Sequence, residues 1–186
     1  MASRELDGIR VAILLDTDFE QVEMTEPRKA LEDAGAICRL ISPRQQVTGV
    51  KHDEKKDTFK VDLPLDGANA DEFDAVLLPG GALNADSLRV NPKAQEFVRK
   101  FDRAGKPMAV ICHAPWLLVS AGLAKGRNLT SYHTIQDDLR NAGARWEDRE
   151  VFVDNNIVTS RQPSDIPAFN REMIRLFREG AKRRAA

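Results

Sequence analysis

Three short, near-continuous apolar runs constrain the fold of this chain more than any other feature. They occupy residues 9–15, 73–78 and 108–111, and they are followed by polar residues, by Pro-Gly-Gly and by cysteine, respectively. Runs of this length are typical of strands that are buried on both faces of a parallel sheet. Because stretches with helical periodicity separate them, we expect an α/β fold, with a mostly parallel central sheet covered by helices on both faces.

The remaining elements follow from periodicity and from turn residues. The polar turn 16–18 is expected to cap a helix that runs to about Ala34, with Val22, Ala30, Leu31 and Ala34 toward the core. Residues 43–71 are polar, charged and too long for a simple connection, which predicts either a short hairpin or an excursion used in assembly. The other predicted strands are 37–41, 129–132, 151–153 and 157–159, and the other predicted helices are 93–104, 114–121, 135–142 and 166 to about 179.

Length and charge limit the classes of function. A chain of 186 residues is expected to form one domain, residues 1–186, around a single core. The net charge of −1 provides no basic field to attract nucleic acid or an anionic membrane. We expect no membrane span, because no apolar run reaches about 18 residues. With two cysteines and no apolar segment of a signal peptide, a cytoplasmic location is expected.

The strongest candidate for a catalytic residue is Cys112, which lies where the predicted strand 108–111 leads directly into a predicted helix. A nucleophile at such a corner is displayed at the edge of the sheet. The positive end of the following helix is expected to favour the thiolate and lower the pKa of Cys112. The competing interpretation is an inert buried thiol, which is the usual state of a free cysteine.

Other useful groups are expected near Cys112, since sites in open α/β sheets form beyond the carboxyl ends of the strands. Gly80 and Gly81 follow the strand 73–78, and their backbone N–H groups could approach an oxyanion closely. The amides of His113, the residue after Cys112, and of Ala114 are further candidate donors. Glu20 and Glu23 begin the first helix, where surface acids are also common.

Histidines and cysteines elsewhere receive plainer interpretations. His113 is a candidate base, but we expect a residue adjacent to the nucleophile to be unable to fold back onto it. His52 is expected to be a solvated loop residue and Cys38 a core thiol. With three scattered histidines and no close cysteine pair, neither a metal site nor another cofactor is expected.

Several motifs, in this order and spacing, match a known family over almost the whole stretch from Ile9 to Phe177. They are Asp-Phe-Glu-Gln-Val-Glu at 18–23, Glu-Phe-Asp-Ala at 72–75, Leu-Pro-Gly-Gly at 78–81, Ala-Val-Ile-Cys-His-Ala-Pro at 109–115, Gly-Arg-Asn-Leu-Thr-Ser-Tyr at 126–132, Asn-Ala-Gly-Ala at 141–144 and Val-Thr-Ser-Arg at 158–161. The chain resembles the PfpI-type intracellular protease and general stress protein family. That family lies within the ThiJ/PfpI superfamily, which has a class I glutamine amidotransferase-like domain and includes the Parkinsonism-associated deglycase.

The resemblance implies a flavodoxin-like three-layer sandwich with Cys112 as nucleophile and His113 beside it. The family's glutamate near the nucleophile maps best onto Glu23, with Glu20 as the second candidate. In PfpI-type members the acid that orients the histidine comes from a neighbouring subunit, and the matching position here is Asp86. The resemblance therefore implies a homo-oligomer, a dimer or larger, whose site is complete only between subunits.

Two departures bear on substrate choice. His133 stands where many members have proline after the tyrosine, here Tyr132, and the loop 44–62 is more charged than usual. Tyr132 is itself a candidate substrate-binding residue.

The resemblance implies a cysteine-dependent hydrolase for stress conditions, acting on peptide or glycated or aldehyde carbonyl substrates, as a peptidase, a deglycase or a glyoxalase-like enzyme. The alternative is a non-enzymatic redox sensor or chaperone-like protein that uses an oxidisable Cys112. A glutamine amidotransferase would need a downstream His-x-Glu pair, which this sequence does not contain.

Overall fold

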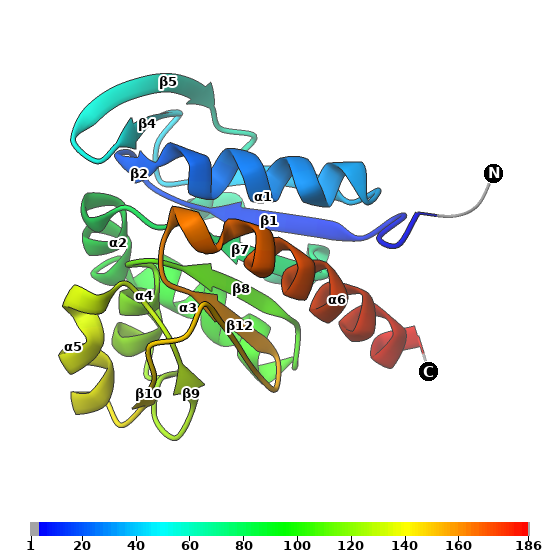
Figure 1. The fold of residues 1–186 in the computed structure, drawn as a ribbon. Helices are drawn as coiled ribbons and strands as arrows, with labels where there is room; N and C mark the ends of the chain where they lie inside the picture. Colours follow the sequence, from blue (N-terminus) through cyan, green and yellow to red (C-terminus); the bar gives the residue numbers. More distant parts are fainter. Residues whose placement is uncertain (1–3, 186) are drawn as a thin grey trace.

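The computed structural model describes residues 4–185 and forms three layers around a seven-stranded sheet (Figure 1). The strand order is β11-β12-β8-β7-β1-β3-β6, and every neighbouring pair is parallel except β11 and β12. The strands are β1 (Arg10–Leu14), β3 (Ile37–Ser42), β6 (Leu63–Pro64), β7 (Ala75–Leu78), β8 (Met108–Ile111), β11 (Val151–Asp154) and β12 (Ile157–Ser160). The central order β3-β1-β7-β8-β12 is that of flavodoxin-like sheets, which confirms the predicted fold class.

Helices cover both faces of the sheet. On one face lie α1 (Gln21–Asp33) and α6 (Ile166–Ala185), and on the other lie α2 (Ala82–Arg89), α3 (Pro92–Arg103), α4 (Pro115–Ser120) and α5 (Gln136–Asn141) (Figure 1). Each face has its own core, and β1 contributes Ala12 and Leu14 to one core and Val11 and Ile13 to the other. This double burial explains the near-continuous apolar run in the sequence.

A second, smaller sheet stands above the amino-terminal end of α1. It consists of β2 (Phe19–Glu20), β4 (Gln46–Lys51) and β5 (Glu54–Lys60), in the order β2-β4-β5 (Figure 1). The antiparallel pair β4–β5 is the hairpin predicted within residues 43–71. The rest of that stretch holds β6 and two short 3-10 turns, Leu65–Gly67 and Ala70–Glu72.

The start of α1 differs from the prediction in two respects. The turn 16–18 does not cap the helix, because β2 intervenes and α1 begins after Glu20, whose side chain makes no capping hydrogen bond. Val22 is 37% exposed, whereas Glu23 and Met24 are fully buried. The helix therefore turns a carboxylate inward where a valine was expected, and this places Glu23 next to the carboxyl ends of the central strands.

Two further elements were predicted wrongly or missed. Of the predicted strand 129–132, only β9 (Asn128–Leu129) forms, and it pairs with β10 (Arg145–Trp146) outside the main sheet. It cannot join the main sheet beside β8, because β7 and β12 already occupy both sides of that strand. Helix α2 was not predicted. Among the described residues, no helix is long and apolar enough to cross a membrane.

Candidate active site

Cys112 lies directly after β8, in a backbone conformation that is rare for residues other than glycine. Its φ is +64°, in the left-handed region that costs of order 1 kcal/mol or more for a residue with a Cβ. Hydrogen bonds hold it there. Its N–H donates to the Ser160 carbonyl over 3.0 Å, and its carbonyl accepts from the Tyr132 N–H over 2.9 Å. The strand-to-helix turn is therefore the strained elbow expected from the sequence.

His113 contacts the Cys112 sulfur directly, contrary to expectation. The distance from Sγ to His113 Nδ1 is 3.1 Å. The left-handed turn at Cys112 reverses the chain sharply, so two consecutive side chains point into the same space. The imidazole is also stacked on the Tyr132 ring, with centroids 4.8 Å apart and planes at 28°, and its Nε2 lies 3.3 Å from Thr134 Oγ1.

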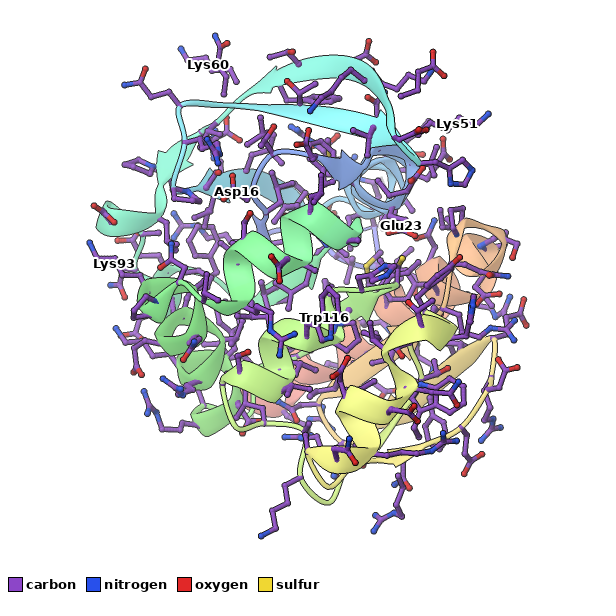
Figure 2. The ribbon with its side chains drawn as sticks, turned by 90° about the vertical axis from the view of Figure 1, so that its left-hand side faces the viewer. Asp16, Glu23, Lys51, Lys60, Lys93 and Trp116 are labelled. Carbon is purple, nitrogen blue, oxygen red and sulfur yellow. The ribbon has the colours of Figure 1, made fainter. Side chains whose placement is uncertain are left out.

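Glu23 is the second group beside the sulfur. It is fully buried, and neither of its carboxyl oxygens has a well-formed hydrogen bond within residues 4–185. Gly80 makes room for it, because a Cβ on Gly80 would lie 2.2 Å from Glu23 Oε2 and 2.5 Å from Cys112 Cβ. In Figure 2, Glu23 lies inside the molecule, between the hairpin that carries Lys51 and the helix that carries Trp116. The Cys112 thiol is a polar neighbour of this carboxyl, so Glu23 can exchange a proton with a molecule that binds at the sulfur.

Burial, together with the smaller effect of the nearby charge of Glu20, raises the pKa of Glu23 to about 8. At neutral pH the Glu23 carboxyl therefore holds its proton and can act as an acid. Burial also raises the pKa of the Cys112 thiol, and any negative charge on Glu23 adds to that effect. This contradicts the lowered pKa expected from the helix end, because α4 has only six residues and the sulfur is buried beside a carboxyl. The thiol and carboxyl titrate as a pair.

Backbone donors surround the sulfur. The N–H groups of Gly81 and His113 hydrogen-bond to Sγ and oppose the rise in the pKa of Cys112. The Ala114 N–H, which we expected to be a donor in the site, instead donates to the Ile111 carbonyl over 3.1 Å. Of these two candidate donors after Cys112, the His113 N–H therefore lies at the sulfur and the Ala114 N–H does not.

Asn84 was missed in the sequence, yet it holds the glycine turn in place. Its side chain is fully buried, and its Nδ2 donates to the carbonyls of Pro79 and Gly80 over 3.0 and 2.9 Å. Its Oδ1 accepts from the Asp16 N–H over 2.6 Å. Asn84 therefore ties the turn after β7 to the turn after β1, but an asparagine within a polar segment gave no signal of this.

The elements predicted to meet at the carboxyl edge of the sheet do meet there. They line a cavity of about 190 Å³ whose walls include Glu20, Glu23, Gly81, Cys112, His113 and Tyr132. His52 also lines this cavity. It is exposed, as expected, but its N–H donates to Glu20 Oε2 over 2.9 Å, which brings the end of the hairpin to the mouth of the site.

Asp86 does not reach His113 within one chain. It is exposed on α2, and it makes no hydrogen bond or ion pair to any of residues 4–185. His133 is closer, because its ring lies 4.6 Å from that of Tyr132, the ring on which His113 stacks. Burial lowers the pKa of His113, and the charge of His133 lowers it further.

Cys38 is 7% exposed within β3, and burial raises its pKa to about 12, which confirms it as a core thiol. Over residues 4–185, no three His, Cys, Asp or Glu side chains are grouped so that they could hold a metal ion.

Residues 9–176 match the model of the DJ-1/PfpI family. The chain belongs to the DJ-1/PfpI family. It is 44% identical over 170 residues to Deglycase PfpI of Pyrococcus furiosus. This match covers 91% of this chain and 100% of the relative. It is 42% identical over 169 residues to Protein/nucleic acid deglycase 2 of Escherichia coli, covering 90% of this chain and 97% of that one. A crystal structure of a two-domain protein from Anabaena variabilis with DJ-1/ThiJ/PfpI-like and ferritin-like domains superposes with a TM-score of 0.85 at 33% identity, covering 90% of this chain and 47% of that one.

The family and the fold agree with the resemblance drawn from the motifs. Relatives named deglycases support an enzymatic role for this DJ-1/PfpI chain.

Proposed function

We propose that this protein is a cysteine-dependent deglycase that releases amines from adducts with 2-oxoaldehydes such as methylglyoxal. The observation that carries the proposal is the contact of the Cys112 sulfur with His113 Nδ1 at 3.1 Å, beside the fully buried Glu23 carboxyl. A nucleophile, a base and an acid thereby line one small cavity. The names of the two deglycase relatives support this reaction.

In the first step the Cys112 thiol gives its proton to His113, and the sulfur attacks the carbinol carbon of the adduct. A C–S bond forms as the C–N bond breaks, and the Glu23 proton goes to the departing amine nitrogen. With a pKa of about 8, Glu23 still holds that proton at pH 7. The product of this step is a thiohemiacetal on Cys112.

In the second step a proton moves from the former aldehyde carbon to the neighbouring ketone carbon, and the hydroxyl proton on the former aldehyde carbon moves to the ketone oxygen. The first carbon is oxidised as the second is reduced, so no external oxidant is needed, and a thioester of a 2-hydroxy acid results. The N–H groups of Gly81 and His113 lie where they can hold the oxygen that becomes negative. Water then hydrolyses the thioester, which gives the 2-hydroxy acid and restores the thiol.

The test compares enzymatic release of the amine with spontaneous dissociation of the adduct. N-acetylarginine modified with methylglyoxal is incubated with the protein, and proton NMR follows free N-acetylarginine and lactate. We expect release to exceed the spontaneous rate at least about tenfold, with one lactate per amine. Release that never exceeds the spontaneous rate, with lactate still formed, would show that the protein converts only the free aldehyde.

We also propose that Asp86 of a neighbouring subunit orients His113. Two observations support this. Asp86 is exposed on α2, and the group that His113 Nε2 contacts within the chain is the Thr134 hydroxyl, not a carboxylate. A carboxylate at that nitrogen would stabilise the imidazolium formed in the first step.

Co-expression of two inactive variants tests this arrangement. Asp86→Asn is expected to lower kcat/KM at least about tenfold, and Cys112→Ser at least about 1,000-fold. If the acid crosses the interface, mixed dimers contain one intact site, and random pairing restores about a quarter of the wild-type activity. Mixed oligomers with no more activity than the separate variants, or a fully active monomer by light scattering, would rule the arrangement out.

A further inference from the structure

The cavity around Cys112 adjoins a second, larger one. The outer cavity has a volume of about 500 Å³ and shares four wall residues with the inner cavity: Glu20, His52, Tyr132 and Pro163. Its remaining walls come from Val22 at the start of α1, Lys51 at the end of β4 and the segment 162–164 before α6. The inner cavity, at about 190 Å³, suits a three-carbon adduct, so a longer substrate bound at Cys112 would continue into the outer one.

The wall between the two cavities is held in place. His52 has a φ of +59°, and its N–H donates to the buried Glu20 carboxylate over 2.9 Å. The hairpin behind it is fastened to α1 by a reciprocal pair, since Gln21 Nε2 donates to Asp57 Oδ2 over 2.7 Å and the Asp57 N–H donates to Gln21 Oε1 over 2.9 Å. The outer cavity is therefore already formed without a ligand.

The outer cavity offers apolar contact. Among the described residues, four large hydrophobic side chains are exposed: Val22, Ile37, Leu83 and Val90. Of these four, only Val22 lines this cavity, together with the Tyr132 ring and Pro163. The Glu20 carboxylate beside them already accepts a hydrogen bond from His52. Lys51 lies at the end of the hairpin nearer Glu23, and Lys60 lies at the far end (Figure 2).

From these contacts we infer that the outer cavity is a specificity subsite, which binds an apolar side chain next to the modified residue of a peptide substrate. The inference rests on the proposed deglycase function for its account of what is bound at Cys112. Val22, Tyr132 and Pro163 contact the apolar side chain, and His52 positions the peptide between the two cavities. Differences of one methylene in such a pocket change specificity by about 10- to 200-fold, so a leucine should be preferred over a serine at least about tenfold.

The test uses two matched peptides, acetyl-Leu-Arg-amide and acetyl-Ser-Arg-amide, each carrying a methylglyoxal adduct on arginine. The Kd of each is measured with the Cys112→Ala protein, in which no chemistry occurs, and kcat/KM is measured with wild type. We expect both quantities to favour the leucine peptide at least about tenfold, and Val22→Ser to reduce this preference to about threefold or less. Val22 is exposed, so its replacement leaves the core intact.

Ile37→Ser is the matched control. Ile37 is a β-branched residue, 49% exposed, at the start of β3 and so at the opposite edge of the sheet. This variant should keep the full preference. Equal Kd values for the two peptides would overturn the subsite. A tenfold preference in Kd without turnover of either peptide would support the subsite and contradict the deglycase proposal.

Discussion

Replacing Cys112 with serine is expected to lower kcat/KM for adduct cleavage at least about 1,000-fold while the protein stays folded. The hydroxyl is a far weaker nucleophile than sulfur, and the rest of the site would be unchanged. Serine is close to cysteine in size, and the left-handed conformation at position 112 is stabilised by backbone hydrogen bonds that the substitution keeps. The rate is measured from amine release, and circular dichroism compares the folding of the two proteins.

Cys38→Ser is the control for this prediction, because Cys38 is the other cysteine of the chain. It lies within β3, and burial holds its pKa at about 12, so it takes no part in the proposed chemistry. The Cys38→Ser variant should retain wild-type kcat/KM. Activity that survives in Cys112→Ser would remove the nucleophile from the proposal, and with it the reaction.

Replacing Glu23 with glutamine is expected to make the protein more stable at high pH and less active. A carboxyl that is fully buried binds its proton more tightly in the folded chain than in the unfolded one, with a pKa of about 8 against 4.5. Its contribution to stability is therefore fully present below pH 4.5 and is lost as the pH rises through 8. Glutamine does not titrate, so its advantage over wild type should grow to about 3 kcal/mol at pH 7 and about 5 kcal/mol above pH 8.

Urea unfolding at pH 4, 7 and 9 measures this difference. The Glu26→Gln variant is the control, because Glu26 lies on the same helix but is exposed, and its effect should stay within about 0.5 kcal/mol at each pH. In the same Glu23→Gln protein, kcat should fall about 100-fold, because no proton reaches the departing amine. A stability difference that does not change with pH would show that Glu23 is not buried in its neutral form.

A gain in stability together with a loss of activity in Glu23→Gln would fit the geometry of the site. Glu23 and the left-handed Cys112 each oppose stability locally, and both lie at the sulfur. Strain and buried polar groups that gather at one point of a fold are typical of catalytic sites.

The apolar runs alone predict the layered α/β fold, because a strand buried on both faces needs apolar side chains at every position. The motifs point to Cys112, Glu23 and the glycine turn, since an elbow and a glycine pair depend on local backbone geometry that neighbouring residues encode.

Contacts between distant segments decided the rest of the site. The rotation of α1 buries Glu23 and exposes Val22, and the left-handed turn at Cys112 brings His113 onto the sulfur. The hairpin places His52 at the mouth of the site only because Glu20 and Gln21 hold it there. Periodicity indicates which elements form, but the direction in which a charged side chain points depends on packing that the linear sequence does not display.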